Sequence, residues 1–178
     1  MPHLTLHTPL GELTVFEADG AIVALDWGRA HMPQAMDEPP SDLLQEAATQ
    51  LHDYFDGLRL DFDLPLNPQG TPFRRQVWDA LRRIPPGETR SYIDIAREIG
   101  CRSPRAIGQA NGSNPIPILI PCHRVVAADG SLGGYSGGEG PATKRYLLAL
   151  EARVRPAAGT GELALFPPSG GQRQGTPR

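Results

Sequence analysis

The sequence predicts an α+β protein in which a small antiparallel-sheet domain comes before a helical domain with a helix-turn-helix. Two observations carry this fold class. Apolar and polar residues alternate in short runs before residue 28, which is typical of a half-buried sheet. From residue 41 onward, apolar residues recur at helical spacing behind residues that cap helices. We place the N-terminal domain at 1–66, the C-terminal domain at 67–153 and a disordered tail at 154–178.

The predicted sheet consists of three short alternating runs, at 4–7, 13–16 and 22–25. Turn residues separate the runs, with proline and glycine in the first gap and Asp19-Gly20 in the second. Such short connections join antiparallel neighbours. The pattern therefore predicts a three-stranded antiparallel meander.

One helix completes the N-terminal domain. Ser41 can cap it, its last residue is about Phe55, and Gly57 ends it. Its apolar face is formed by Leu44, Ala47, Ala48, Leu51, Tyr54 and Phe55. Residues 31–40 before the helix predict a loop, and residues 61–70 after it predict a linker.

Four helices are predicted in the C-terminal domain. The first begins behind Thr71 with Pro72 at its first position, and the others span about 91–99, 103–111 and 141–153. The second and third, joined by a short turn with Gly100, have the form of a helix-turn-helix. Many small helical domains carry such a turn without touching DNA, so the pattern alone leaves this function open. Pro104 also disfavours helical geometry at Ser103, which leaves the entry to the third helix unsettled.

Composition limits the function classes. The 178 residues suffice for one or two small domains, and they hold no apolar run of about 18 residues and no signal-peptide pattern. We therefore expect a soluble, cytoplasmic monomer that does not bind membranes. The cysteines, Cys101 and Cys122, are expected to be reduced there. No histidine lies at zinc-ligand spacing from either cysteine, so we expect no metal and no cofactor.

The charge is unevenly distributed. Residues 1–71 hold 2 Arg against 12 acidic residues, whereas residues 72–126 hold 9 Arg against 4, although the whole chain has a net charge of -3. Phosphate contacts need local positive charge, and the basic section contains Cys122. Because 16 of the 17 basic residues are Arg, codon bias is an alternative explanation.

Cys122 and His123 are the candidate nucleophile and its activator. Pro121-Cys122-His123 follows an apolar, proline-punctuated run at 114–120, which predicts a rigid and buried seat for the sulfur. A thiolate is the reactive form of cysteine, and a neighbouring imidazole favours it. A free cysteine can equally be a small buried hydrophobe, so the dipeptide alone does not decide.

Motifs on both sides of Cys122 carry a family resemblance. In chain order they are Gly70-Thr71-Pro72-Phe73, Val77-Trp78, 84–92, Arg105-Ala106-Ile107-Gly108, 121–126 and 133–138. In that order and spacing, from about Leu4 to Glu151, they resemble the O6-alkylguanine-DNA alkyltransferase family of suicidal DNA repair proteins. The resemblance implies a ribonuclease H-like N-terminal domain and a winged-helix C-terminal domain.

The resemblance also implies the chemistry. An alkyl group on guanine O6 lies within the base stack, so the nucleotide must be flipped out of duplex DNA. Cys122 would accept the alkyl group, His123 would take its proton through a water, and Glu151 would orient the imidazole. The product thioether has no ready hydrolytic route back, so each molecule would react only once. The substrate would be O6-alkylguanine or O4-alkylthymine.

Further roles follow only from the resemblance. Asn114 would hold the turn before the active-site segment, Tyr92 would donate to the guanine ring, and Arg105 would fill the gap left by the flipped nucleotide. The expected DNA contacts are Arg105, Tyr92, Arg102, Gln109, Ser91 and Arg124. The pocket would be formed by Val125, Tyr135, Ser136 and Gly137, with the Ser136 amide donating to the leaving O6 and the carbonyls of Cys122 and Val125 accepting from the exocyclic amine.

Other function classes remain as alternatives. A non-catalytic relative could bind and flip alkylguanine without repairing it, but such relatives replace the acceptor cysteine, and this chain has Cys122. A Cys/His hydrolase or a plain helix-turn-helix regulator would not account for Tyr92, Arg105 and Asn114 together with Cys122.

Overall fold

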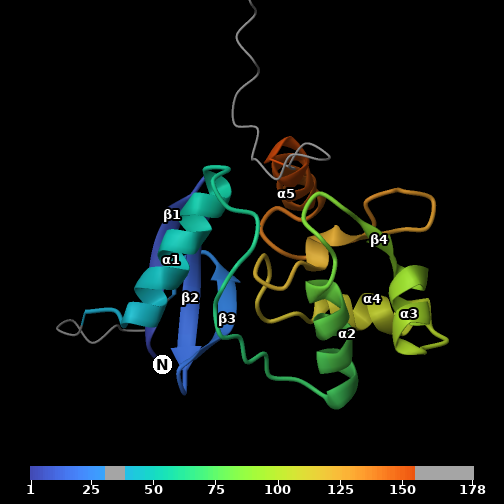
Figure 1. The fold of residues 1–178 in the computed structure, drawn as a ribbon, viewed down its shortest axis with the longest axis horizontal. Helices are drawn as coiled ribbons and strands as arrows, with labels where there is room; N and C mark the ends of the chain where they lie inside the picture. The colour runs from blue at the N-terminus through green and yellow to red at the C-terminus, as the bar shows by residue number, and fades with distance from the viewer. Residues whose placement is uncertain (31–38, 155–178) are drawn as a thin grey trace, which may run out of the picture.

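The computed structural model of the chain describes residues 1–30 and 39–154. Figure 1 shows the three-stranded sheet with α1 (Asp42–Phe55) on one side of the molecule, and α2, α3 and α4 on the other. The expected loop at 31–40 lies mostly outside the described residues, and the expected disordered tail lies almost wholly outside them. No helix in the described part of the chain is long and apolar enough to span a membrane.

The sheet is the predicted meander. Its strands β1 (His3–Thr8), β2 (Gly11–Ala18) and β3 (Ala21–Trp27) pair antiparallel in the order β1-β2-β3. Helix α1 packs on β1 and β2. The linker then returns to the sheet, because Ile22 forms a parallel bridge with Leu66. This pairing closes the N-terminal domain.

Side-chain caps start the helices where the sequence predicts. Ser41 accepts from the amide of Leu44 at the start of α1, and Thr71 accepts from the amide of Arg74 at the start of α2 (Pro72–Arg82). Each bond satisfies one of the amides that a helix N-terminus leaves without a partner. Trp78 joins α2 to α4 (Pro104–Gly112), because its indole donates to the carbonyl of Ala110 at 2.9 Å.

The helix-turn-helix consists of α3 (Tyr92–Ile99) and α4 (Pro104–Gly112). Gly100, in the left-handed conformation at φ 72°, ends α3. Ser103 is extended at φ -115° and caps α4, with Pro104 in its first turn. The geometry that Pro104 disfavours at Ser103 is therefore not needed, and the proline begins the helix.

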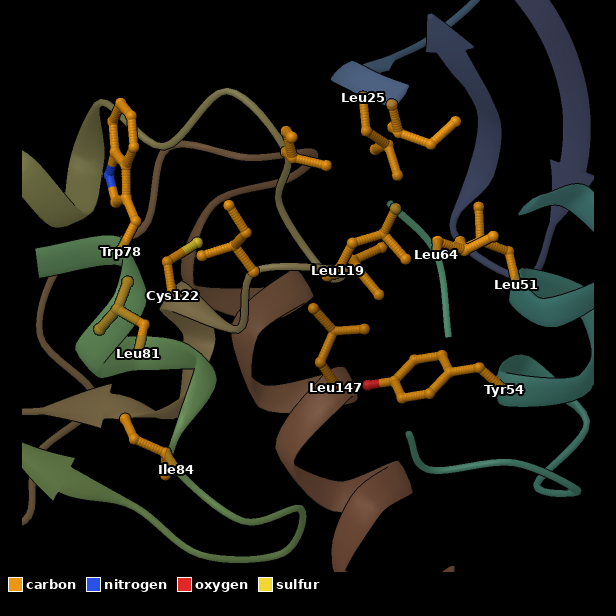
Figure 2. Close-up of a cluster of buried hydrophobic side chains, with 14 of the residues drawn as sticks. Leu25, Leu51, Tyr54, Leu64, Trp78, Leu81, Ile84, Leu119, Cys122 and Leu147 are labelled. Carbon is orange, nitrogen blue, oxygen red and sulfur yellow. The ribbon is translucent and has the colours of Figure 1, made fainter. Parts of the chain in front are cut away.

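The segment at 114–121 lies between the N-terminal and C-terminal domains. It leads into a 3₁₀ turn, η1 (Cys122–Arg124), and then β5 (Val125–Val126), which pairs parallel with β4 (Arg90–Ser91). Helix α5 (Pro141–Val154) packs on η1. Figure 2 shows Cys122 in an apolar cluster that runs from Trp78 and Leu81 on α2 to Leu51 and Tyr54 on α1, so both halves share one core.

Candidate active site

The segment before Cys122 is held by an asparagine. Asn114 donates from Nδ2 to the carbonyl of Ile120 at 2.8 Å and accepts at Oδ1 from the amide of Ile116 at 3.0 Å. It therefore closes the loop that contains Ile118, whose φ is 72°. A β-branched residue at positive φ is strained, so the surrounding contacts must maintain it. The loop places Cys122 at the first position of η1, with its side chain buried.

His123, the residue after Cys122, forms a buried pair with Glu151. His123 Nε2 lies 2.8 Å from Glu151 Oε1, and both side chains are fully buried. Because Nε2 must carry the hydrogen in this bond, Nδ1 is the acceptor of the neutral ring. Within the described part of the chain, Nδ1 has no hydrogen-bond partner. The ring is thus oriented to receive a proton.

Glu151 is held as a carboxylate by several donors. Arg124 donates from Nε to Oε2 at 3.0 Å and from Nη2 to Oε1 at 2.8 Å, and the hydroxyl of Tyr54 donates to Oε1 at 2.9 Å. Burial alone would raise the pKa of Glu151, but the hydrogen bonds from His123 and Arg124 outweigh it and lower the pKa to about 2. In Figure 2 the Tyr54 hydroxyl points from α1 toward α5, the helix that carries Glu151.

In the absence of substrate, the Cys122 thiol is protonated and the His123 imidazole is neutral. Burial raises the pKa of Cys122, against the hydrogen bond from Asn114 and the positive charge of Lys144, which lower it. Burial likewise lowers the pKa of His123, against its bond to Glu151. A protonated thiol beside a neutral imidazole is the pair needed for proton transfer when a substrate arrives.

Cys122 opens into a cavity of about 640 Å³. Its lining includes the predicted Tyr92, Asn114, Tyr135, Ser136 and Gly137, and also Trp27 and Asn111, which were not predicted. This volume lies in the range of small-molecule sites, about 300–1,000 Å³. The cavity is therefore large enough for an extruded base with a substituent.

The N-terminal domain contributes a wall of the cavity. A Cβ at Gly137 would lie 2.5 Å from Nε1 of Trp27, so the indole at the end of β3 packs directly on the glycine-rich loop. Trp27 Nε1 is buried and has no hydrogen-bond partner among the residues described, and the buried Tyr135 hydroxyl lies beside Cys122. Burial, followed by the nearby Cys122, raises the pKa of Tyr135, which keeps its phenol protonated.

The helix-turn-helix lies beside the cavity. A second hollow is bordered by Arg105 and Gln109 and shares Tyr92 and Gly108 with the cavity of Cys122. Arg105, Gln109 and Arg102 are all exposed. Ser91 caps α3 in a reciprocal pair of hydrogen bonds with Asp94. Arg105, which is expected to fill the gap left by the flipped nucleotide, thus lies next to the expected pocket.

Two expectations require correction or qualification. Arg124 was expected to contact DNA, but its side chain is buried and bonded to Glu151 and to the carbonyl of Ile84 at 2.7 Å. The Arg124 guanidinium therefore holds the carboxylate of Glu151 and does not contact a phosphate. The Val125 carbonyl, expected to accept from the substrate, already accepts from Lys144 Nζ at 2.6 Å.

Four residues of the site were missed in the sequence. Tyr54 and Trp27 follow apolar patterns that predict only core packing, and Asn111 lies at the end of a predicted helix. Lys144 had a signal, because it is the one lysine among 17 basic residues. It is fully buried, and burial lowers its pKa, against the effect of Cys122. No group of three potential metal ligands occurs within residues 1–30 and 39–154.

Both halves of the chain match domains of known proteins. Residues 2–68 match the 6-O-methylguanine DNA methyltransferase ribonuclease-like domain, and residues 72–153 match the DNA-binding domain of the same proteins. The constitutive methylated-DNA--protein-cysteine methyltransferase of Bacillus subtilis is 44% identical over 158 residues, 84% of this chain and 94% of that protein.

Solved structures give the same result. The O6-methylguanine methyltransferase of Mycobacterium tuberculosis is 42% identical, with a TM-score of 0.75, and the match covers 88% of this chain and 95% of that one. Mycobacterium tuberculosis OGT in complex with DNA matches with a TM-score of 0.72 at 42% identity, over 84% of this chain and 92% of that one. The predicted α+β fold, with its ribonuclease-like and DNA-binding domains, is confirmed.

Proposed function

The chain belongs to the 6-O-methylguanine DNA methyltransferase family and repairs DNA by alkyl transfer to a cysteine; we propose that this cysteine is Cys122. The observation that carries the proposal is the placement of Cys122 in the cavity, directly before the buried His123–Glu151 pair. Cys101, the second free cysteine, lies in the turn before α4 and does not line that cavity.

The reaction is a single displacement at the alkyl carbon. The thiol proton passes through a water to Nδ1 of His123, and the Sγ–C bond forms as the C–O6 bond breaks. The electron pair of that bond stays on the guanine, which regains the proton. Glu151 stabilises the positive charge that the imidazole carries in between, because its carboxylate lies 2.8 Å from Nε2. The product thioether retains the alkyl group, so each molecule reacts once.

The cavity stabilises the leaving base. The amide of Ser136 donates to O6, and Tyr92, which lines the cavity, donates to the ring. Burial, followed by the nearby Cys122, raises the pKa of Tyr92, so its hydroxyl remains a donor. Donors that are already oriented in a partly closed site cost little reorganisation when charge develops on the base.

Duplex DNA carrying O6-alkylguanine is the proposed partner. Arg105 and Gln109 are exposed beside the cavity, Arg102 is exposed in the turn before α4, and Arg105 enters the duplex as the base leaves it. We also propose that O4-alkylthymine is a substrate. The active species would be a monomer, and the protein would be located in the cytoplasm. One chain supplies Cys122, His123 and Glu151, and a reducing compartment keeps its two free thiols available.

A turnover count with two matched variants tests the proposal. Methyl transfer from O6-methylguanine duplex should stop at one equivalent per chain, and Cys122→Ser should transfer none while Cys101→Ser transfers one. Arg105→Ala should slow repair of duplex by tenfold or more yet leave reaction with free O6-benzylguanine nearly unchanged, since only the duplex requires flipping. Repeated turnover, or full activity in Cys122→Ser, would disprove the assignment of Cys122.

A further inference from the structure

Asn111 has one side-chain atom with a partner and one without. It is the residue before the last of α4, is only 5% exposed, and lines the cavity together with Cys122. Its Nδ2 donates to the carbonyl of Cys122 at 3.3 Å. Its Oδ1 is buried and accepts from no group of the described chain. A residue that lines the cavity thus holds one buried acceptor without a partner among the residues described.

The orientation of this amide is determined by its neighbour. A backbone carbonyl can only accept, so the atom of Asn111 that faces Cys122 O must be the nitrogen. Asn114 gives a contrast in the same lining, because both its Nδ2 and its Oδ1 are bonded to backbone groups. An unmet buried acceptor costs about 1–3 kcal/mol. Both side-chain atoms of Asn114 therefore have backbone partners, whereas the Oδ1 of Asn111 has none among the residues described.

We propose that Asn111 Oδ1 accepts a hydrogen bond from the 2-amino group of the extruded guanine. The inference rests on the proposed function and adds a recognition residue to it. Alkylation at O6 leaves N1, N3 and N7 of the base as acceptors, and N9 is bonded to the sugar. The two N–H groups of the 2-amino group are then the only polar donors on the base. An unused acceptor in this cavity thus points to that group.

The neighbouring carbonyl supports the same pairing. Cys122 O accepts from Asn111 Nδ2 and has a second lone pair, so the 2-amino group can meet Oδ1 and Cys122 O together. Cys122 O and Val125 O each already accept one hydrogen bond, from Asn111 and from Lys144, whereas Asn111 Oδ1 accepts from nothing described. O4-alkylthymine has no N–H on its base, so Asn111 favours alkylguanine over alkylthymine. A site built to bond a substrate N–H discriminates against analogues that lack it.

The test uses two bases that differ only in the 2-amino group. These are 9-methyl-O6-benzylguanine and 9-methyl-6-benzyloxypurine, in which N9 is blocked and cannot donate. Rate constants for alkylation of the full-length protein are measured with each base, and their ratio is the readout. Intrinsic reactivity cancels when the ratio is compared between variants. Gln76→Leu, an exposed amide on α2, is the matched control and should keep the wild-type ratio.

Two substitutions separate recognition from support of Cys122. Asn111→Leu should lower the guanine-to-purine ratio about tenfold, equivalent to about 1.4 kcal/mol. Asn111→Asp keeps an acceptor oxygen but loses the amide donor, so both rates should fall while the ratio stays near the wild-type value. If Leu prevents folding, Asn111→Ala takes its place and should lower the ratio likewise.

Each contrary result is distinct. If the rate constants with the two bases fall equally in Asn111→Leu, or in Asn111→Ala in its place, Asn111 only supports Cys122. The inference would then be wrong. A ratio in Asn111→Asp that falls as far as in Leu would show that the residue acts through the Cys122 carbonyl alone, with the same consequence. A wild-type protein that transfers no methyl group from O6-methylguanine duplex to Cys122 would reject the proposed function, and the inference with it.

Discussion

Replacing Glu151 by glutamine removes the charge that holds three neighbours in the buried site. The carboxylate accepts from Tyr54, His123 and twice from Arg124, and it is fully buried. Its pKa is about 2 in the folded chain against an ordinary value of 4.5. At about 1.4 kcal/mol per pKa unit, this difference corresponds to about 3 kcal/mol of stability at neutral pH. Removing one partner of a buried ion pair typically costs a similar 3–5 kcal/mol.

The pH dependence gives the sign of the effect. A carboxylate whose pKa is depressed by folding contributes its full stability above its ordinary pKa of 4.5, and loses it as the pH falls toward about 2. Glu151→Gln cannot titrate, so the gap between wild type and variant should be about 3 kcal/mol at pH 7 and should shrink below pH 4.

Urea unfolding at pH 7, 5, 4 and 3 measures this gap. Far-ultraviolet circular dichroism gives the free energy of unfolding at each pH, and alkyl transfer to free O6-benzylguanine gives the activity of the same samples. Glu151→Gln should slow that transfer as well as destabilise the fold. A gap below about 1 kcal/mol at pH 7, or one that does not change down to pH 3, would refute the role given to the buried carboxylate.

Two further perturbations test how the N-terminal domain supports the site. Tyr54→Phe removes a donor that competes for Glu151 Oε1; the pKa of His123 should rise, and the loss of alkyl transfer on acidification should begin at higher pH. An unshifted pH-rate profile would reduce Tyr54 to a packing residue. Gly137→Ala would place a Cβ 2.5 Å from Trp27 Nε1 and should slow transfer at least tenfold, whereas Gly134→Ala, which meets nothing within 4 Å, should not; equal rates would contradict the close packing.

Local signals predicted most of the secondary structure. Ser41, Thr71 and Ser91 act through bonds to amides three residues away, so their effect can be read from neighbouring residues. Gly100 ends α3 because it adopts positive φ at little cost. Pro104 gave a mixed signal, since the same ring that disfavours a helical residue before it also favours the first turn of a helix.

Long-range contacts in the site could not be predicted. Tyr54 and Glu151 are 97 positions apart, and an apolar stripe does not show which aromatic hydroxyl meets a carboxylate. Arg124 belongs to a basic section, but its charge is neutralised internally because Glu151 is folded against it. Family resemblance indicated Cys122, His123 and Glu151, whereas the unused oxygen of Asn111 depends on how α4 packs beside Cys122.

The central claim is that Cys122 keeps the alkyl group. Intact mass spectrometry after reaction with one equivalent of O6-methylguanine duplex, followed by peptide mapping, tests it most directly. We predict a mass increase of one methyl group, found on the peptide that contains Cys122, with no further reaction when fresh substrate is added. An unchanged mass with demethylated DNA, or a methyl group on Cys101, would contradict the account.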